Sequence, residues 1–139
     1  MQPYMHRVQY YETDKMGVTH HANYIRWMEE ARIAFLDVIG WSFARLEASG
    51  IVSPVTAVDC HYDASTTFDD MVAIEVKVEA FNGVTLTIGY TMRKADGTVV
   101  CTAHSQHCFL NHEGHFIRLK RDYPAFYEAL MAQLAPDQA

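Results

Sequence analysis

Residues 14–24 place a carboxylate, a glycine and two histidines directly before a strongly apolar helical pattern. The carboxylate of Asp14 can attack a carbonyl or remove a proton from water. The first N–H groups of a helix lack partners inside the helix, so they can receive a developing negative oxygen. Gly17 allows the backbone to approach a ligand closely. This spacing predicts a site at the start of the helix, although an aspartate before a helix also commonly serves a turn or a cap.

Other chemistries find less support in the sequence. The adjacent His20 and His21 diverge, and no second ligand pair stands at helical spacing, so we expect no metal site. Catalysis by a cysteine needs a base beside the thiol. The sequence offers none, because the neighbours in Cys60-His61 and in His107-Cys108 lie on strands and point to opposite faces. Nucleophile-elbow, phosphate-binding and dinucleotide motifs are also missing, so we expect no cofactor.

The elements that must position Asp14 follow from hydrophobic periodicity. Alternation and aromatic residues predict a first strand over residues 7–11, and helical spacing predicts a long buried helix over 24–38 that ends before Gly40. The remaining elements are a short helix within 41–49, strands over 55–62, 71–80, 84–92 and 98–110, and a short helix over 124–134. Because one helix must cover this antiparallel sheet, we expect the sheet to curl around it.

Composition limits the classes of protein that the chain can belong to. Its 139 residues suit one domain, residues 1–139, with a frayed tail over about 135–139. A net charge of −6 argues against general nucleic-acid binding. No apolar run is long enough to span a membrane, the first ten residues lack a signal-peptide core, and three unpaired cysteines suit a reducing compartment. We therefore expect a cytoplasmic protein with no membrane or nucleic-acid partner.

The segment from Tyr11 to Arg32, YETDKMGVTHHANYIRWMEEAR, resembles the opening of the 4-hydroxybenzoyl-CoA thioesterase family of hotdog-fold acyl-CoA hydrolases. The family pattern has an aspartate, a Gly-Val pair, and a His/Asn/Tyr segment that opens the central helix. The resemblance implies that Asp14 is the catalytic carboxylate and that the backbone N–H of His21 polarises the thioester carbonyl. It places Asn23 and Tyr24 near the acyl pocket. His20 stands where many relatives carry an aromatic residue, and Ser65-Thr66 where a proline is frequent.

The resemblance further implies an α+β hotdog fold of five to six curved antiparallel strands around one long helix, paired into homodimers or homotetramers. The substrate would be an acyl-CoA thioester. A thiol with a pKa near ~8.5 leaves without a strong general acid, so an oxygen nucleophile and an oxyanion donor suffice. Asp14 could act as nucleophile or as general base.

Two other functions stay open. The chain could hydrolyse thioesters of acyl carrier protein. Carrier proteins are acidic, so we would expect Arg118, Lys120 and Arg121 to contact the carrier protein. These residues, or Arg93-Lys94, could instead bind CoA phosphates. A non-catalytic module that binds acyl thioesters is the alternative from a different class.

Overall fold

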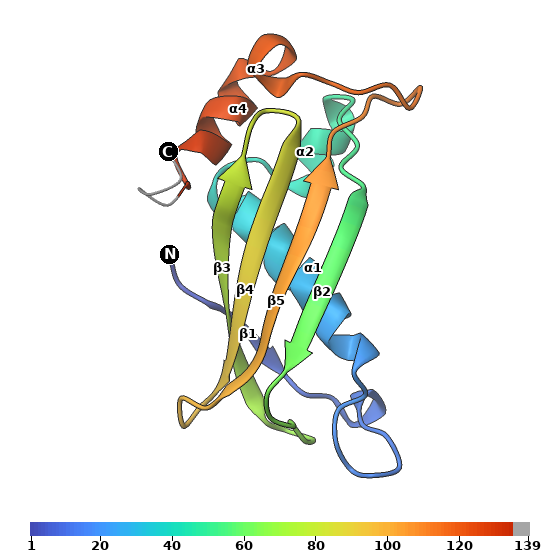
Figure 1. Ribbon diagram of the computed structural model, residues 1–139, viewed down its shortest axis with the longest axis vertical. Helices are drawn as coiled ribbons and strands as arrows, with labels where there is room; N and C mark the ends of the chain where they lie inside the picture. The colour runs from blue at the N-terminus through green and yellow to red at the C-terminus, as the bar shows by residue number, and fades with distance from the viewer. Residues whose placement is uncertain (135–139) are drawn as a thin grey trace. The chain divides into compact units, whose positions relative to one another are not determined.

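The computed structural model describes residues 1–134 (Figure 1), so the predicted frayed tail at 135–139 lies outside the described residues. The elements in chain order are β1 (Tyr4–Arg7), η1 (Tyr10–Glu12), α1 (Ala22–Val38), α2 (Phe43–Ala48), β2 (Val55–Tyr62), β3 (Met71–Phe81), β4 (Thr85–Lys94), β5 (Val99–Cys108), α3 (Leu119–Asp122) and α4 (Pro124–Met131). Five strands form one sheet in the order β1-β3-β4-β5-β2, in which β3, β4 and β5 are consecutive neighbours. No helix within residues 1–134 has the length and apolar character needed to cross a membrane.

Most of these elements agree with the sequence-based predictions. In β3 the apolar residues Val72, Ile74 and Val78 are buried, whereas Glu75 is exposed, as alternation requires. The β3–β4 and β4–β5 turns each contain a glycine with positive φ, Gly83 and Gly97. The short helix α3 was not predicted.

The prediction of a first strand over residues 7–11 is wrong. β1 ends at Arg7, after pairing antiparallel with β3 from Tyr4 opposite Ile74 to Arg7 opposite Met71. The chain then turns into the single-turn helix η1, in which the N–H of Gln9 donates to the Glu12 carboxylate at 2.8 Å. The aromatic residues that looked like strand positions, among them Tyr10, are exposed in this turn.

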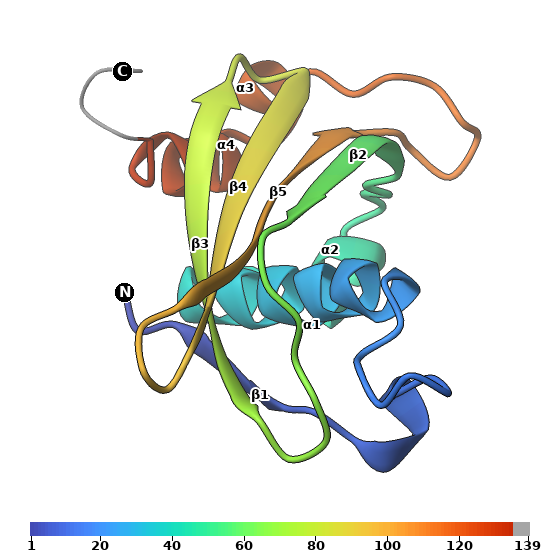
Figure 2. The same ribbon diagram turned by 60° about the horizontal axis from the view of Figure 1, so that its bottom comes forward.

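The chain divides into two compact units, and the first comprises residues 1–32, 59–76 and 90–103. Here the first half of α1 contacts β1 and the end of β2. The hydroxyl of Tyr4 in β1 donates to Glu30 at 2.8 Å, and the thiol of Cys60 in β2 contacts the Met28 sulfur at 3.6 Å. Figure 2 brings forward the blue loop that leaves η1 and turns back to the start of α1.

The second unit comprises residues 33–58, 77–89 and the described part of 104–139. An aromatic cluster forms its interior, with Phe126 of α4 at ring-centroid distances of 5.1 Å from Trp41 and 5.8 Å from Phe109. The N–H of Leu119 at the start of α3 donates to Gly83 in the β3–β4 turn at 3.2 Å, so α3 and α4 lie beside this turn (Figure 1). The prediction of a single domain for the whole chain stays a prediction.

Candidate active site

A pocket of about 470 Å³ lies in the first unit, at the start of α1. It takes its walls from three segments: the loop before α1, the first turn of α1, and the end of β2 with the residues that follow. Of the five residues singled out in the sequence, Asp14, His21 and Tyr24 line it. The full lining is Asp14, Met16, Val18, Thr19, His21, Tyr24, Tyr62, Asp63, Ala64 and Ser65.

Asp14 lies in the loop between η1 and α1 and is half-buried. One carboxylate oxygen, Oδ1, accepts a hydrogen bond from the N–H of Met16 at 2.8 Å, so Asp14 does serve its own turn. Its backbone is also held, because its N–H donates to Val18 at 2.9 Å. The second oxygen, Oδ2, has no hydrogen-bond partner within residues 1–134, which leaves it available to a ligand in the pocket.

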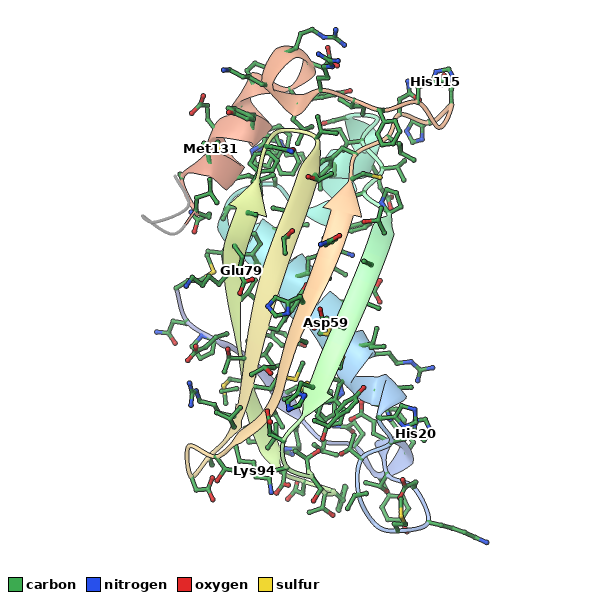
Figure 3. All side chains as sticks on the ribbon, in the orientation of Figure 1. His20, Asp59, Glu79, Lys94, His115 and Met131 are labelled. Carbon is green, nitrogen blue, oxygen red and sulfur yellow. The ribbon has the colours of Figure 1, made fainter. Side chains whose placement is uncertain are left out.

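The backbone N–H groups at the start of α1 have acceptors, with one exception. The N–H of Ala22 donates to the Nδ1 atom of His20 at 3.2 Å, and those of Asn23 and Tyr24 donate to the carbonyls of His20 and His21. The N–H of His21 has no acceptor in the described part of the chain. His20, labelled in Figure 3, therefore acts as a cap for the helix, whereas the N–H of the adjacent His21 is not used by this cap.

A cluster of hydroxyl groups lies beside the pocket and includes two of its lining residues, Thr19 and Tyr24. The Thr66 side chain is 1% exposed, and its Oγ1 lies 2.6 Å from Thr19 Oγ1 and 3.0 Å from the Tyr24 hydroxyl. Burial raises the pKa of Tyr24, more than the hydrogen bond with Thr66 lowers it. The Tyr24 phenol therefore stays neutral at physiological pH and can donate or accept a hydrogen bond.

Tyr62, at the end of β2, also lines the pocket. Its hydroxyl donates to the His21 carbonyl at 3.0 Å, and its ring meets the Tyr24 ring edge-on at a centroid distance of 5.2 Å. Burial raises the pKa of Tyr62 to about 12, with a further contribution from Cys60. Two phenol rings in contact thus line the same pocket as Asp14 and His21.

The other two residues singled out in the sequence lie beside the pocket rather than on its lining. Gly17 has a φ of +82°, a backbone conformation that residues with a side chain rarely adopt. Its carbonyl accepts a hydrogen bond from Thr67 Oγ1 at 2.8 Å. Asn23 is buried, and its side-chain amide donates to the carbonyl of Glu12 at 2.9 Å. Both residues shape the loop that carries Asp14, and their contact with a substrate stays a prediction.

The contribution of Tyr62, Asp63 and Ala64 to the pocket was not predicted from the sequence, whereas the family resemblance had pointed to Ser65. Tyr62 ends β2, and Asp63 and Ala64 follow it, some forty positions after the loop, and no local pattern links them to Asp14. Asp63 adds a second carboxylate to the lining, with its Oδ1 3.2 Å from His61 Nε2. Within residues 1–134, no three His, Cys, Asp or Glu side chains gather in an arrangement that could hold a metal ion.

Comparison with known proteins identifies this architecture. Residues 8–134 match the Thioesterase-like superfamily. A provisionally named esterase of Aquifex aeolicus is 34% identical over 107 residues, which are 77% of this chain and 83% of that protein. The acyl-CoA thioester hydrolase YbgC of Escherichia coli O6:H1 is 30% identical over 68% of this chain and 70% of that protein.

The solved structure of DHNA-CoA thioesterase from Staphylococcus aureus superposes on this chain with a TM-score of 0.90. The two share 30% identity, with 94% of this chain and 89% of that chain covered. These likenesses confirm the resemblance seen over Tyr11 to Arg32 and the predicted hotdog fold, here with five strands. The chain belongs to the Thioesterase-like superfamily and is a thioester hydrolase.

Proposed function

We propose that this protein hydrolyses an acyl-CoA thioester to the free acid and CoA, and that the pocket at the start of α1 is its active site. The observation that carries the proposal is the meeting of two groups at one pocket. Asp14 presents a carboxylate oxygen, Oδ2, without a hydrogen-bond partner among the described residues, and His21 presents a backbone N–H without an acceptor there.

These two groups suffice for thioester hydrolysis. The His21 N–H donates to the carbonyl oxygen as negative charge develops on it, a contribution of about 3–4 kcal/mol for one such donor in comparable sites. Asp14 either attacks the carbonyl carbon or takes a proton from a water that attacks it. The C–S bond then breaks, and CoA leaves as a thiolate, because a thiol with a pKa near ~8.5 needs no strong general acid.

The two routes differ in where the oxygen of water goes. In the first, Asp14 forms a mixed anhydride with the acyl group, and water then hydrolyses it. In the second, the oxygen of water goes directly into the acid product. The test is a single turnover in oxygen-labelled water, followed by mass spectrometry of the peptide that contains Asp14. If water attacks the anhydride at the Asp14 carbonyl, the label enters Asp14, and this label identifies the nucleophilic route.

The acyl group is proposed to be compact and aromatic. The S. aureus relative is named as a thioesterase of DHNA-CoA, and in this chain Tyr24 and Tyr62 place two aromatic rings at a pocket of about 470 Å³. Flat aromatic acyl groups can stack on such rings or meet them edge-on. We propose that Asn23 and Gly17 hold the loop against the bound acyl group.

Hydrolysis of a panel of acyl-CoA thioesters, followed by release of free thiol, tests the proposal. The panel contains aromatic, short-chain and long-chain acyl groups, together with matched acyl carrier protein thioesters. We expect aromatic acyl-CoA thioesters to give the highest kcat/KM, and Asp14→Asn to lower their kcat about 10²–10⁴-fold. A folded Asp14→Asn variant with undiminished turnover contradicts the proposed site, and binding of every thioester without hydrolysis favours a non-catalytic role.

We also propose that the protein assembles as a homodimer or homotetramer. β2 lies at one edge of the five-stranded sheet, and it is exposed at every residue except Cys60, including the apolar Val55 and Val58. An exposed apolar edge strand favours pairing with a second chain. Sedimentation equilibrium tests this, since a monomer at micromolar concentration contradicts it. The cytoplasmic location stays a prediction.

A further inference from the structure

Glu12 is a buried carboxylate that the proposed chemistry does not use. It ends η1, two residues before Asp14, and is only 4% exposed. Burying an ionised carboxylate is costly unless hydrogen bonds compensate it, so its presence here requires an explanation. A pocket role is excluded, because Glu12 is not among the residues that line the pocket.

Three donors from three elements converge on this carboxylate. Oε1 accepts from the Gln9 N–H and from His6 Nε2 of β1, both at 2.8 Å, and Oε2 accepts from Trp27 Nε1 of α1 at 2.6 Å. Burial raises the pKa of Glu12, but these hydrogen bonds outweigh burial and hold the pKa below its ordinary value. Glu12 is therefore ionised at neutral pH and acts purely as an acceptor.

The backbone carbonyl of Glu12 extends the same junction to the start of α1. It accepts from the His20 N–H at 2.8 Å and from Asn23 Nδ2 at 2.9 Å. The loop 13–19 leaves from Glu12 and returns to it through His20, and its two ends also pair, Thr13 opposite Thr19. Asp14 follows one end of this closed loop, and the His21 N–H follows the other.

We propose that Glu12 is a positioning residue that fixes the Asp14 carboxylate relative to the backbone N–H of His21. The inference rests on the proposed function of those two groups. Its side chain holds η1 to β1 and α1, and its carbonyl holds the start of α1, so both reacting groups are placed through one residue. A displacement of about 1 Å in such a site can lower the rate by a factor of about 10².

Glu12→Gln is the sharpest test, because it keeps the shape of the side chain and removes one acceptor. A glutamine with its oxygen toward Gln9 and His6 turns its NH₂ toward the Trp27 N–H, and the flipped amide turns its NH₂ toward the Gln9 N–H. Either orientation sets one donor against another. The matched control is Glu30→Gln, since Glu30 also contacts His6, at 3.3 Å from Nδ1, but makes no bond to the loop or to η1.

We expect kcat of Glu12→Gln to fall about 10- to 100-fold with KM changed by less than about threefold. Amide hydrogen exchange in residues 13–21 should become faster. Glu30→Gln should match the wild type in both measurements. A folded Glu12→Gln variant with wild-type kcat, or an equal loss in Glu30→Gln, overturns the proposal.

Trp27→Phe supplies a second variant that removes one donor and keeps an aromatic ring. If Glu12→Gln fails to fold, a lower kcat at unchanged KM in Trp27→Phe supports the proposal, and a wild-type kcat overturns it. Asp14→Asn separates the proposed function from the positioning role of Glu12. An undiminished kcat in Asp14→Asn refutes the proposed function, whereas a loss of about 10²–10⁴-fold there, together with wild-type kcat in Glu12→Gln, refutes only the positioning role.

Discussion

Removing the Thr66 hydroxyl should lower the free energy of unfolding, because this hydroxyl makes hydrogen bonds with Thr19 and Tyr24. Thr66→Val keeps the size of a side chain that is 1% exposed and deletes the contacts at 2.6 Å to Thr19 and at 3.0 Å to the Tyr24 hydroxyl. At about 1 kcal/mol for each hydrogen bond, the free energy of unfolding should fall by about 2 kcal/mol. Tyr24→Phe deletes only one of these bonds and should cost about 1 kcal/mol.

A double-mutant cycle isolates the bond between the two residues. Each single variant deletes this bond, so the free energy of unfolding of the double variant should fall by about 2 kcal/mol rather than by the sum of about 3 kcal/mol. The difference is a coupling energy of about 1 kcal/mol. Urea unfolding followed by tryptophan fluorescence measures all four proteins. Thr56→Val, on the exposed strand β2, is the control for loss of a hydroxyl and should change stability by less than about 0.5 kcal/mol. A coupling below about 0.3 kcal/mol refutes the hydroxyl cluster as a stabilising unit.

Three further predictions concern other parts of the chain. The pKa of Glu12 in the folded state is below its ordinary value of 4.5, so the ionised carboxylate stabilises the fold fully above pH 4.5 and loses this effect as the pH falls through the folded pKa. Urea unfolding should therefore show that the difference in free energy of unfolding between the wild type and Glu12→Gln narrows below about pH 4.5. Gly89→Ala should cost about 1 kcal/mol or less, because the new Cβ, 2.6 Å from Cδ of Glu79, would meet only the far end of a flexible side chain that can turn away, and thermal unfolding should show no cost when Glu79→Ala is combined with it. Burial, followed by the nearby Cys60, raises the pKa of Cys101 to about 12, so iodoacetamide at pH 8 should label the native Cys101 thiol about 10³-fold more slowly than the unfolded one.

The elements with a clear period were predictable from the sequence. The alternation of Val72, Ile74 and Val78 is a local property of β3, and the turns at Gly83 and Gly97 carry their own chemistry. The strand predicted over residues 7–11 failed because alternation cannot reveal a tertiary contact. There the buried Glu12, bonded to Trp27, bends the chain into η1.

The candidate site divides in the same way. Asp14, His21 and Tyr24 are close in sequence, so their spacing around the helix start predicted a shared location. Tyr62 and Asp63 reach the pocket only through the placement of β2, which no local pattern encodes. The role of Glu12 was likewise invisible in the sequence, because its three donors come from β1, from η1's cap and from α1.

The central claim is that the Asp14 carboxylate performs the oxygen chemistry of thioester hydrolysis. The most direct measurement compares kcat of Asp14→Asn with that of Asp63→Asn, since both carboxylates line the same pocket and receive the same change. We predict a loss of about 10²–10⁴-fold for Asp14→Asn and less than about threefold for Asp63→Asn, with both variants folded as the wild type. Equal losses, or a larger loss for Asp63→Asn, would contradict the assignment of Asp14.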